Sequence, residues 1–411
     1  MAIEGGIGVS TNSDFAAAAA EAATEALRTC ASPKVALMFV NHSYPLAQLN
    51  EAIAAARQAL PKGTTLAGGT VNGITYGDTR YDAMFNNKRA IAVVALGGDI
   101  LVGVAIVPDP ASDSTDAGRR LAEKARQGLG GRVGEGALIL TPGMSGFHVT
   151  DQQLLDGIRS VNPRMRVSGT GLTAGIMPDG MILPGFAFVD DTIEQRGAVL
   201  ITFAGPARMG FSSANGMQAV GGGGFVTDAE GPVIKTIDRK PARDAILELL
   251  CGDDAEAREH FNRSPFIAAV ERGVTLGALD PEGGHYWCHM PVAFLPDGSA
   301  IDPFVARKGT PLSVVRIDPS TCMDAVREAG TMLVEDAGTD TFEFTLAFSC
   351  ALRGYTLGAD VAHEDQRLRD MVKSKNHLGI VANGEVGSYR HGRSLATGWV
   401  YALFGLAGQG G

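Results

Sequence analysis

The pattern of hydrophobic and polar positions recurs three times along the chain. Each copy opens with a short apolar segment and a helix-periodic stretch, and Ser, Asp or Thr precedes that stretch as an N-cap residue does. These openings lie at 7–27, 101–129 and 312–335. A continuously apolar run follows at 35–40, 137–141 and 344–350. Such runs are typical of strands buried on both faces, so the pattern predicts βαβ units.

Each copy continues in the same way after its second strand. A second helix-periodic stretch leads to a glycine-rich strand end, at 66–77, 167–180 and 378–392, and a last apolar strand follows at 90–96, 197–205 and 399–406. One unit of roughly 95–105 residues, strand–helix–strand–helix–strand–strand, therefore occurs three times. We interpret this as a duplication; similar patterning of unrelated βα units is the alternative.

The segment between the second and third copies, about 206–311, has a different pattern. "GGGGFVTDAEGPVIKTID" predicts a hairpin with Asp-Ala-Glu-Gly in its turn, and "HYWCHMPVAFLPDGSAI" predicts another with Pro-Asp-Gly in its turn. The expected fold is α/β: three βαβαββ-type repeats with mixed sheets, plus this inserted, mainly antiparallel segment. We divide the chain into 1–225, with two repeats, and 226–411, with the β-rich insertion to about 311 and then the third repeat.

Composition and charge exclude several classes of protein. The net charge of −10 argues against a nucleic-acid-binding protein, which needs a basic surface, and against docking on acidic lipid. The five cysteines are scattered and form no CxxC pair, which argues against a disulfide framework and a structural zinc site. The N-terminus lacks a basic signal-peptide region, and no long uncharged apolar stretch predicts a membrane span. We expect a reduced, cytoplasmic protein.

Five motifs in order resemble the FIST family over nearly the whole chain. They are "LAGGTVNGI", "GFVTDAEGPVIKTIDRKPA", "DGSAI" followed by "KGTPLSVVRID", "FSCALRG" and "GIVANGEVG". The N-terminal FIST region would span about 31–225 and the C-terminal region about 240–400. The resemblance implies a bacterial, stand-alone sensor of small molecules, with amino-acid-like or carboxylate-like ligands. Because the chain shows no kinase, cyclase or receiver segment, signalling would need a separate partner such as a histidine kinase.

The resemblance also implies haem as an alternative cofactor, because some stand-alone members are described as haem proteins that report nitric oxide. A haem needs one axial imidazole in a large apolar pocket. The histidine that stands near "GFSSANG" (210–216) in many members is absent here, which weakens this implication. We therefore assign no cofactor and keep haem as an alternative.

Ligands of open α/β sheets bind beyond the carboxyl ends of the strands. If the repeats pack around a pseudo-threefold axis, the loops after the second and third strands of each copy converge on one cleft. We predict ligand contacts from these loops. The predicted ligand-binding residues are Asn41, Ser43, Ser145, Cys350, Arg353, Asn383 and Glu385.

The third copy carries the most distinctive side chains at its strand ends. Arg353 can bind a carboxylate bidentately, or it forms a buried ion pair with Glu385. Cys350 ends an apolar run, so packing is favoured over ligand contact and over a nucleophilic role that would need His377 or His391 as base. Glu385 either binds an amine or acts as a base, or it accepts hydrogen bonds from loop N–H groups.

Other candidate motifs are explained by local structure. Asn72 and Asn383 each precede a glycine, and Asn-Gly is first of all a turn dipeptide. His285 and His289 are four apart, but on the predicted strand they lie about 13 Å apart, too far to share a metal ion. The glycine-rich 219–226 lacks the Gly-Lys-Ser/Thr ending of a phosphate loop. We predict no metal site and no catalytic residue. The expected function is a small-molecule sensor; the alternatives are a haem-based nitric oxide sensor and a hydrolase using Cys350 or Glu385.

Overall fold

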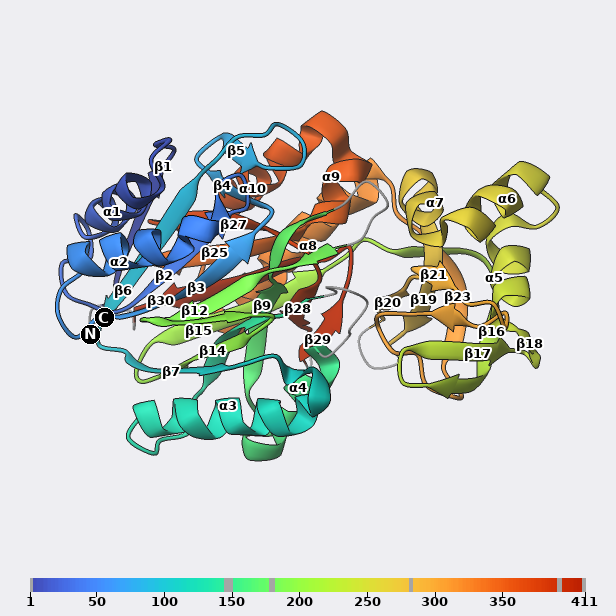
Figure 1. Ribbon diagram of the computed structural model, residues 1–411, viewed down its shortest axis with the longest axis horizontal. Coiled ribbons are helices and arrows are strands. Elements are labelled where there is room, and N and C mark those ends of the chain that lie inside the picture. The colour runs from blue at the N-terminus through green and yellow to red at the C-terminus, as the bar shows by residue number, and fades with distance from the viewer. Residues whose placement is uncertain (1–2, 144–150, 177–181, 281–283, 390–393, 409–411) are drawn as a thin grey trace.

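The computed structural model describes residues 3–408 apart from 144–150, 177–181, 281–283 and 390–393 (Figure 1). The chain forms a large α/β body and a smaller lobe at one end of it. Three sheets of the body have the same four-stranded centre, one from each repeat. In spatial order they are β1 (Ile3–Ser10), β6 (Ile91–Gly98), β2 (Pro33–Asn41) and β3 (Thr65–Val71); β7 (Leu101–Val107), β14 (Ala198–Ala204), β8 (Gly136–Thr141) and β9 (Arg166–Gly171); and β15 (Arg208–Ala214), β30 (Tyr401–Ala407), β25 (Phe344–Cys350) and β27 (His377–Ala382).

Strand directions are also the same in all three sheets. The last two strands of each centre run parallel (β2 with β3, β8 with β9, β25 with β27), and the other pairs are antiparallel. A parallel pair needs a crossover connection, and a helical one is present in each repeat. The expected α/β fold of three repeats with mixed sheets is therefore confirmed.

Each repeat also contributes one β-hairpin to the sheet of another repeat. β4 (Gly73–Tyr76) and β5 (Thr79–Asp82) extend the third sheet beside β27. β12 (Phe186–Val189) and β13 (Thr192–Gln195) extend the first sheet beside β3. β28 (Glu385–Ser388) and β29 (Ser394–Thr397) extend the second sheet beside β9. The exchange is cyclic, so no repeat completes a sheet without another repeat.

Helices cover the outer face of each sheet. They are α1 (Phe15–Ala26) and α2 (Leu49–Ala59) on the first sheet, α3 (Ser114–Gly128) and α4 (Asp151–Val161) on the second, and α8 (Pro319–Ala337) and α10 (His363–Arg369) on the third, where α9 (Ala351–Leu357) follows β25. Asp14, Asp113 and Asp318 cap α1, α3 and α8 by accepting a backbone N–H, as their position before the helices predicts. The inner faces share one core, in which Phe203 and Phe404 stack at 5.3 Å.

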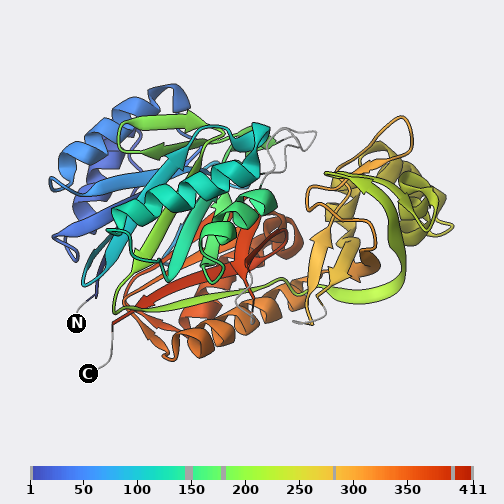
Figure 2. The same cartoon turned by 90° about the horizontal axis from the view of Figure 1, so that it is seen from below.

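The lobe consists of the chain from β16 to β23. Its elements are β16 (Gln218–Glu230), β17 (Val233–Ile237), β18 (Lys240–Pro241), α5 (Ala242–Cys251), α6 (Ala255–Arg263), α7 (Pro265–Arg272), β19 (Val274–Leu279), β20 (Tyr286–His289), β21 (Ala293–Phe294), β22 (Ala300–Ile301) and β23 (Pro311–Arg316). Figure 2 shows the lobe beside the body from below, with the chain entering it through β16. The two expected turns are present, between β16 and β17 and between β21 and β22. Tyr286–His289 pairs with β19 instead of completing the second hairpin.

The expected limits of the insertion, 206–311, are wrong at both ends. β15 (208–214) pairs with β30 and is the first strand of the third repeat. β23 (311–316), which we expected in that role, pairs with β16 and β19 in the lobe. The boundary at 225/226 likewise falls inside β16. β23 misleads because it directly precedes the capped helix α8, and only the pairing partner distinguishes the two apolar strands.

Candidate functional site

The strand-end loops of the three repeats meet at the centre of the body, as expected. Asn72 Nδ2 donates to Asn383 Oδ1 at 2.8 Å, which joins the first and third repeats. Gly171 N–H donates to the Gly384 carbonyl at 2.8 Å and joins the second repeat to the third. Glu385 pairs with Thr170 across β28 and β9. The convergence follows from the parallel strands, whose carboxyl ends lie at one end of each sheet.

This meeting point is packed with protein. A Cβ added at Gly171 would lie 2.1 Å from the Asn383 carbonyl oxygen, and one at Gly143 would lie 3.0 Å from the same atom. Gly143 also has a φ of +66°, which favours glycine. The glycines therefore permit the close approach of three backbones rather than the binding of a ligand between them.

Arg353 lies on α9 beside this centre, with 0% of its surface exposed. Its Nε donates to Glu364 Oε1 at 2.6 Å, and its terminal nitrogens donate to the carbonyls of Trp399 (3.2 Å) and Cys322 (2.7 Å). The paired carboxylate is Glu364, so the expected alternative of a pair with Glu385 is wrong. Protein acceptors hold the guanidinium in this state, and its role as a ligand anchor stays a prediction.

Cys350 and Glu385 are buried against each other. Burial raises the pKa of both groups well above its usual range, and the nearby Glu385 raises the pKa of Cys350 further. Hydrogen bonds to Glu385 from the Cys350 thiol and from Val400 N–H, which is 3.4 Å from Oε2, oppose the rise in its pKa without reversing it. Burial therefore favours the protonated, uncharged form of both groups. A thiol held in this form is not an activated nucleophile.

The remaining predicted residues lie apart from this pair or outside the described residues. His377, the proposed base for Cys350, pairs with Thr345 at the other end of the two strands and cannot reach it. Asn41 is fully buried and bonds to the backbone of 88–90. The Ser43 hydroxyl is buried and has no partner among the described residues. Ser145 and His391 lie outside the described residues.

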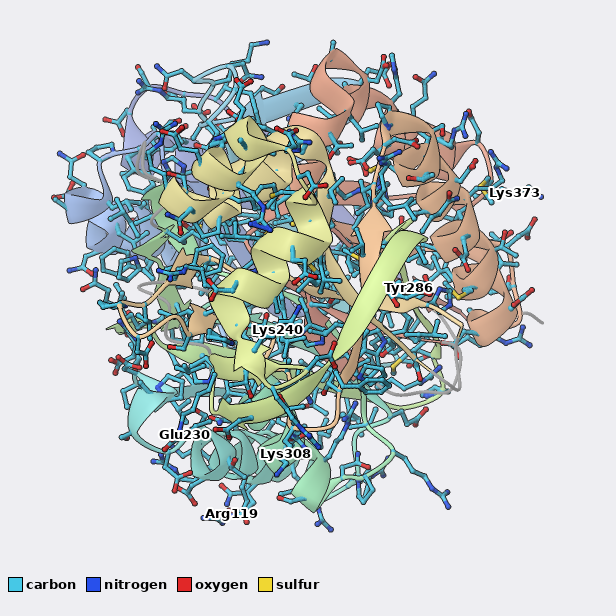
Figure 3. All side chains as sticks on the ribbon, turned by 90° about the vertical axis from the view of Figure 1, so that its right-hand side faces the viewer. Arg119, Glu230, Lys240, Tyr286, Lys308 and Lys373 are labelled. Carbon is cyan, nitrogen blue, oxygen red and sulfur yellow. The ribbon has the colours of Figure 1, made fainter. Side chains whose placement is uncertain are left out.

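A cleft of about 600 Å³ lies between the body and the lobe. The body contributes side chains of α4 and β29, and the lobe contributes β19, β20 and the segment 304–311. The lining residues are Gln152, Gln153, Asp156, Ala229, Gly231, Ala278, Leu279, Asp280, Trp287, Cys288, His289, Phe304, Val305, Ala306, Arg307, Lys308, Thr310, Pro311, Leu395 and Ala396. Of the residues predicted from the sequence, none that the structure describes lines it. Figure 3 views the molecule from the side of the lobe and labels Lys308, one of the residues that line the cleft.

The floor of the cleft adjoins the buried centre. Cys288 lines the cleft, and its backbone N–H donates to Thr397 Oγ1 at 3.3 Å. Thr397 pairs in turn with Glu385 across β29 and β28. Burial raises the pKa of the Cys288 thiol well above its usual range, with smaller contributions from Asp302 and Glu385. Thr397 therefore links the lining residue Cys288 to Glu385.

A buried histidine–aspartate pair that the sequence reasoning missed lies on the lobe wall. His289 Nδ1 is 2.7 Å from Asp302 Oδ2, and the two residues are 5% and 1% exposed. Asp302 also accepts the N–H groups of Phe304 (3.1 Å) and Ala306 (2.9 Å). Between these two lies Val305, whose φ of +58° is strained for a β-branched residue and costs about 1–3 kcal/mol. Asp302 thus holds both the imidazole and a strained loop at the cleft.

Charged side chains surround the mouth of the cleft. Arg307 Nη2 of the lobe lies 3.9 Å from Asp156 Oδ2 of α4, and this contact joins the lobe to the body. The two side chains are 78% and 42% exposed, so the contact contributes less than about 1 kcal/mol. Lys308 and Asp280 line the same cavity. Arg307 can therefore turn from Asp156 to an anion at little cost in free energy.

The described residues contain no group of three His, Cys, Asp or Glu side chains that could hold a metal ion. The lining of the cleft between body and lobe does not fit haem. A haem requires a broad apolar slot, whereas amide and charged side chains occupy much of this cleft. We therefore derive no step through haem. A Soret band on protein expressed with a haem supply would contradict this reading.

Comparisons with known proteins give one family match. The family model of the FIST N domain matches residues 34–240. No curated protein matches the chain. Among solved structures, the crystal structure of cyanuric acid hydrolase from A. caulinodans is similar over 99% of both chains, with 8% identity and a TM-score of 0.34. No inference about chemistry follows from that likeness. No helix in the described part of the chain is long and apolar enough to cross a membrane.

Proposed function

The chain belongs to the FIST family of sensory, ligand-binding domains, and we propose that it senses a small carboxylate or amino acid bound in the cleft between body and lobe. The observation that carries the proposal is the cleft itself, to which both units contribute side chains. Its volume of about 600 Å³ lies within the usual range of small-molecule sites.

The lining matches the chemistry of such a ligand. Arg307 and Lys308 offer charge-assisted hydrogen bonds to a carboxylate, and Asp156 or Asp280 offers an acceptor for an amine. Trp287 and Phe304 supply apolar surface for the rest of the ligand. In this proposal Cys350, Arg353, Asn383 and Glu385 act behind the floor of the cleft rather than on the ligand.

Closure of the lobe on the body is the proposed switch. The Arg307–Asp156 contact is exposed and weak, so the two units can separate at the mouth of the cleft at little cost. A ligand that bonds to both units favours the closed state by the difference between its affinities for the two states. We propose that a separate cytoplasmic partner, such as a histidine kinase, reads this closure.

Ligand binding can be tested by thermal shift and calorimetry with glutarate, succinate, glutamate and the neutral glutaramide. We expect the anions to raise Tm and glutaramide to have little effect, because free ligand stabilises the state that binds it. Arg307→Gln/Lys308→Gln should weaken anion binding roughly tenfold to a hundredfold, the range for charged hydrogen bonds. Lys62→Gln/Arg132→Gln is the matched control, because it removes the same charge from exposed loops of the body. Anion binding that survives the Arg307/Lys308 change, or no binding at all, contradicts the proposal.

A further inference from the structure

The His289–Asp302 pair has the geometry of an oriented base. Asp302 accepts from the imidazole at Nδ1 and from two backbone N–H groups, so its carboxylate is fixed in place. The proton of the neutral ring therefore lies on Nδ1, and the lone pair lies on Nε2. His289 lines the cleft, and its hydrogen bond to the described residues is made through Nδ1, which leaves Nε2 free of them. The pair thus places an oriented imidazole in the wall of a cavity that can hold a small molecule.

We propose that His289 is a general base for hydrolysis in this cleft, acting on an ester or amide that carries a carboxylate. The substrate class rests on the anion binding proposed above. His289 Nε2 takes a proton from water as the water oxygen forms a bond to the substrate carbonyl carbon. The bond from that carbon to the leaving oxygen or nitrogen then breaks, and the imidazolium returns the proton to the leaving group. The products are an acid and an alcohol or amine.

Water is a better nucleophile here than the neighbouring side chains. Cys288 and His289 are consecutive on β20, so their side chains leave opposite faces of the strand. The Cys288 thiol is also fully buried. Thr310 Oγ1 accepts the backbone N–H of Arg307 at 3.1 Å and stabilises the loop. Within the described part of the chain, neither side chain has the hydrogen bond to an imidazole that activates a nucleophile.

Burial of the His289–Asp302 pair carries a desolvation penalty, which suggests a functional reason for keeping the pair. Burial removes both groups from water, and an apolar pair of the same size is often no less stable. The loop bonded to Asp302 holds the strained Val305 at the rim of the same cavity. Strained backbone persists where the surroundings over-determine it, and such positions cluster at functional sites. The pair and the strain occur together at the cleft wall.

The test compares the hydrolysis of 4-nitrophenyl hydrogen glutarate with that of the neutral 4-nitrophenyl butyrate by the full chain. We expect faster turnover of the anionic ester, and His289→Gln should lower kcat by about 10²–10⁴-fold. His363→Gln is the matched control, because that histidine is 60% exposed on α10, outside the cleft. It should leave the rate unchanged.

Asp302 is a positioning residue, and its test needs a readout beyond loss of rate. Asp302→Asn should lower kcat more than it changes KM, because the amide no longer fixes the orientation and tautomer of the imidazole. Asp302→Glu keeps a carboxylate and should recover part of the lost kcat, whereas a merely structural role predicts no such recovery.

The outcomes separate this inference from the proposed function. Turnover that survives His289→Gln, or no turnover of either ester, overturns the inference, while glutarate binding in the same preparation leaves the sensor proposal intact. Faster turnover of the butyrate ester overturns the substrate class. If His289→Gln fails to fold, as judged by circular dichroism, the comparison of Asp302→Asn with Asp302→Glu decides: an unchanged kcat in folded Asp302→Asn overturns the inference. Partial rescue of His289→Ala by added imidazole supports the base; a folded His289→Ala protein without rescue counts against it.

Discussion

Replacing Arg353 by methionine should remove a large part of the stability of the body. The change leaves the Glu364 carboxylate, 2% exposed, without its cation and removes the donors to the Trp399 and Cys322 carbonyls. Breaking a buried ion pair on one side costs about 3–5 kcal/mol, and each orphaned acceptor costs about 1–3 kcal/mol in isolation. Because these losses share one side chain they are not additive, and we expect a total of about 4 kcal/mol.

Urea unfolding followed by tryptophan fluorescence measures the effect. The chain has two tryptophans, Trp287 in the lobe and Trp399 in the body, so a Trp287→Phe background reports on the body alone. With an m value of about 3 kcal/mol/M, a loss of 4 kcal/mol lowers the midpoint by about 1.3 M. Arg369→Met is the control: its pair with Asp78 is exposed and should contribute less than about 1 kcal/mol.

A double-mutant cycle tests the reason for the loss. In Arg353→Met/Glu364→Gln no buried charge remains, and the introduced glutamine can still accept from Ser349 Oγ, which is 2.6 Å from Glu364 Oε2 in the native protein. The double variant should therefore be more stable than Arg353→Met alone. A loss below about 1 kcal/mol in Arg353→Met, or a double variant less stable than the single one, would refute the argument that an uncompensated charge causes the loss.

Three further predictions concern the buried centre. Burial raises the folded-state pKa of Glu385 above its unfolded value of about 4.3. The contribution of Glu385 to the free energy of unfolding is therefore full below that pH and decreases as the pH rises. In urea unfolding between pH 5 and 8, Glu385→Gln should lose less stability with rising pH than the wild type does. Gly171→Ala should cost about 1–3 kcal/mol because its Cβ meets the Asn383 carbonyl, whereas Gly221→Ala, with nothing within 4 Å, should cost little; equal midpoints would contradict this. All five cysteines are buried, so iodoacetamide should label none in the native protein at pH 8 and all five in urea; rapid native labelling of Cys350 would show that the centre opens.

The repeats could be predicted because their signals are local. An apolar run, an N-cap residue and a helical period each lie within about ten residues, and the three capped helices begin where these signals place them. The exchanged hairpins have no such signal. β4 pairs with β27 about three hundred residues away, and nothing in the polar–apolar pattern of either strand identifies its partner. For the same reason the sequence pattern did not show that β15, and not β23, is the first strand of the third repeat: only the pairing partners distinguish the two strands.

The candidate site was harder to predict than the fold. The strand-end rule correctly located the place where Asn72, Asn383 and Gly171 meet, but it could not indicate that backbone fills this place. The cleft forms where the lobe contacts α4 and β29, so its existence depends on how two units pack. His289 and Asp302 lie 13 residues apart with a hairpin between them, and only the folded chain makes them partners. The spacing of His285 and His289 drew attention to a metal instead.

The way in which the chain enters and leaves the lobe bears on how such a protein arises. Gln218 and Arg316 are cross-strand partners, so the two crossing points lie about 5 Å apart. A gene encoding the body alone would therefore need only a short linker between Met217 and Ile317, and an ancestor without the lobe is topologically simple. Leu352, Leu357 and Trp399 of the third repeat are now buried in one cluster with lobe residues. Removal of the lobe from the present protein would expose these apolar side chains on the body. Polar residues at positions 352 and 357 would then be needed to keep the body from aggregating.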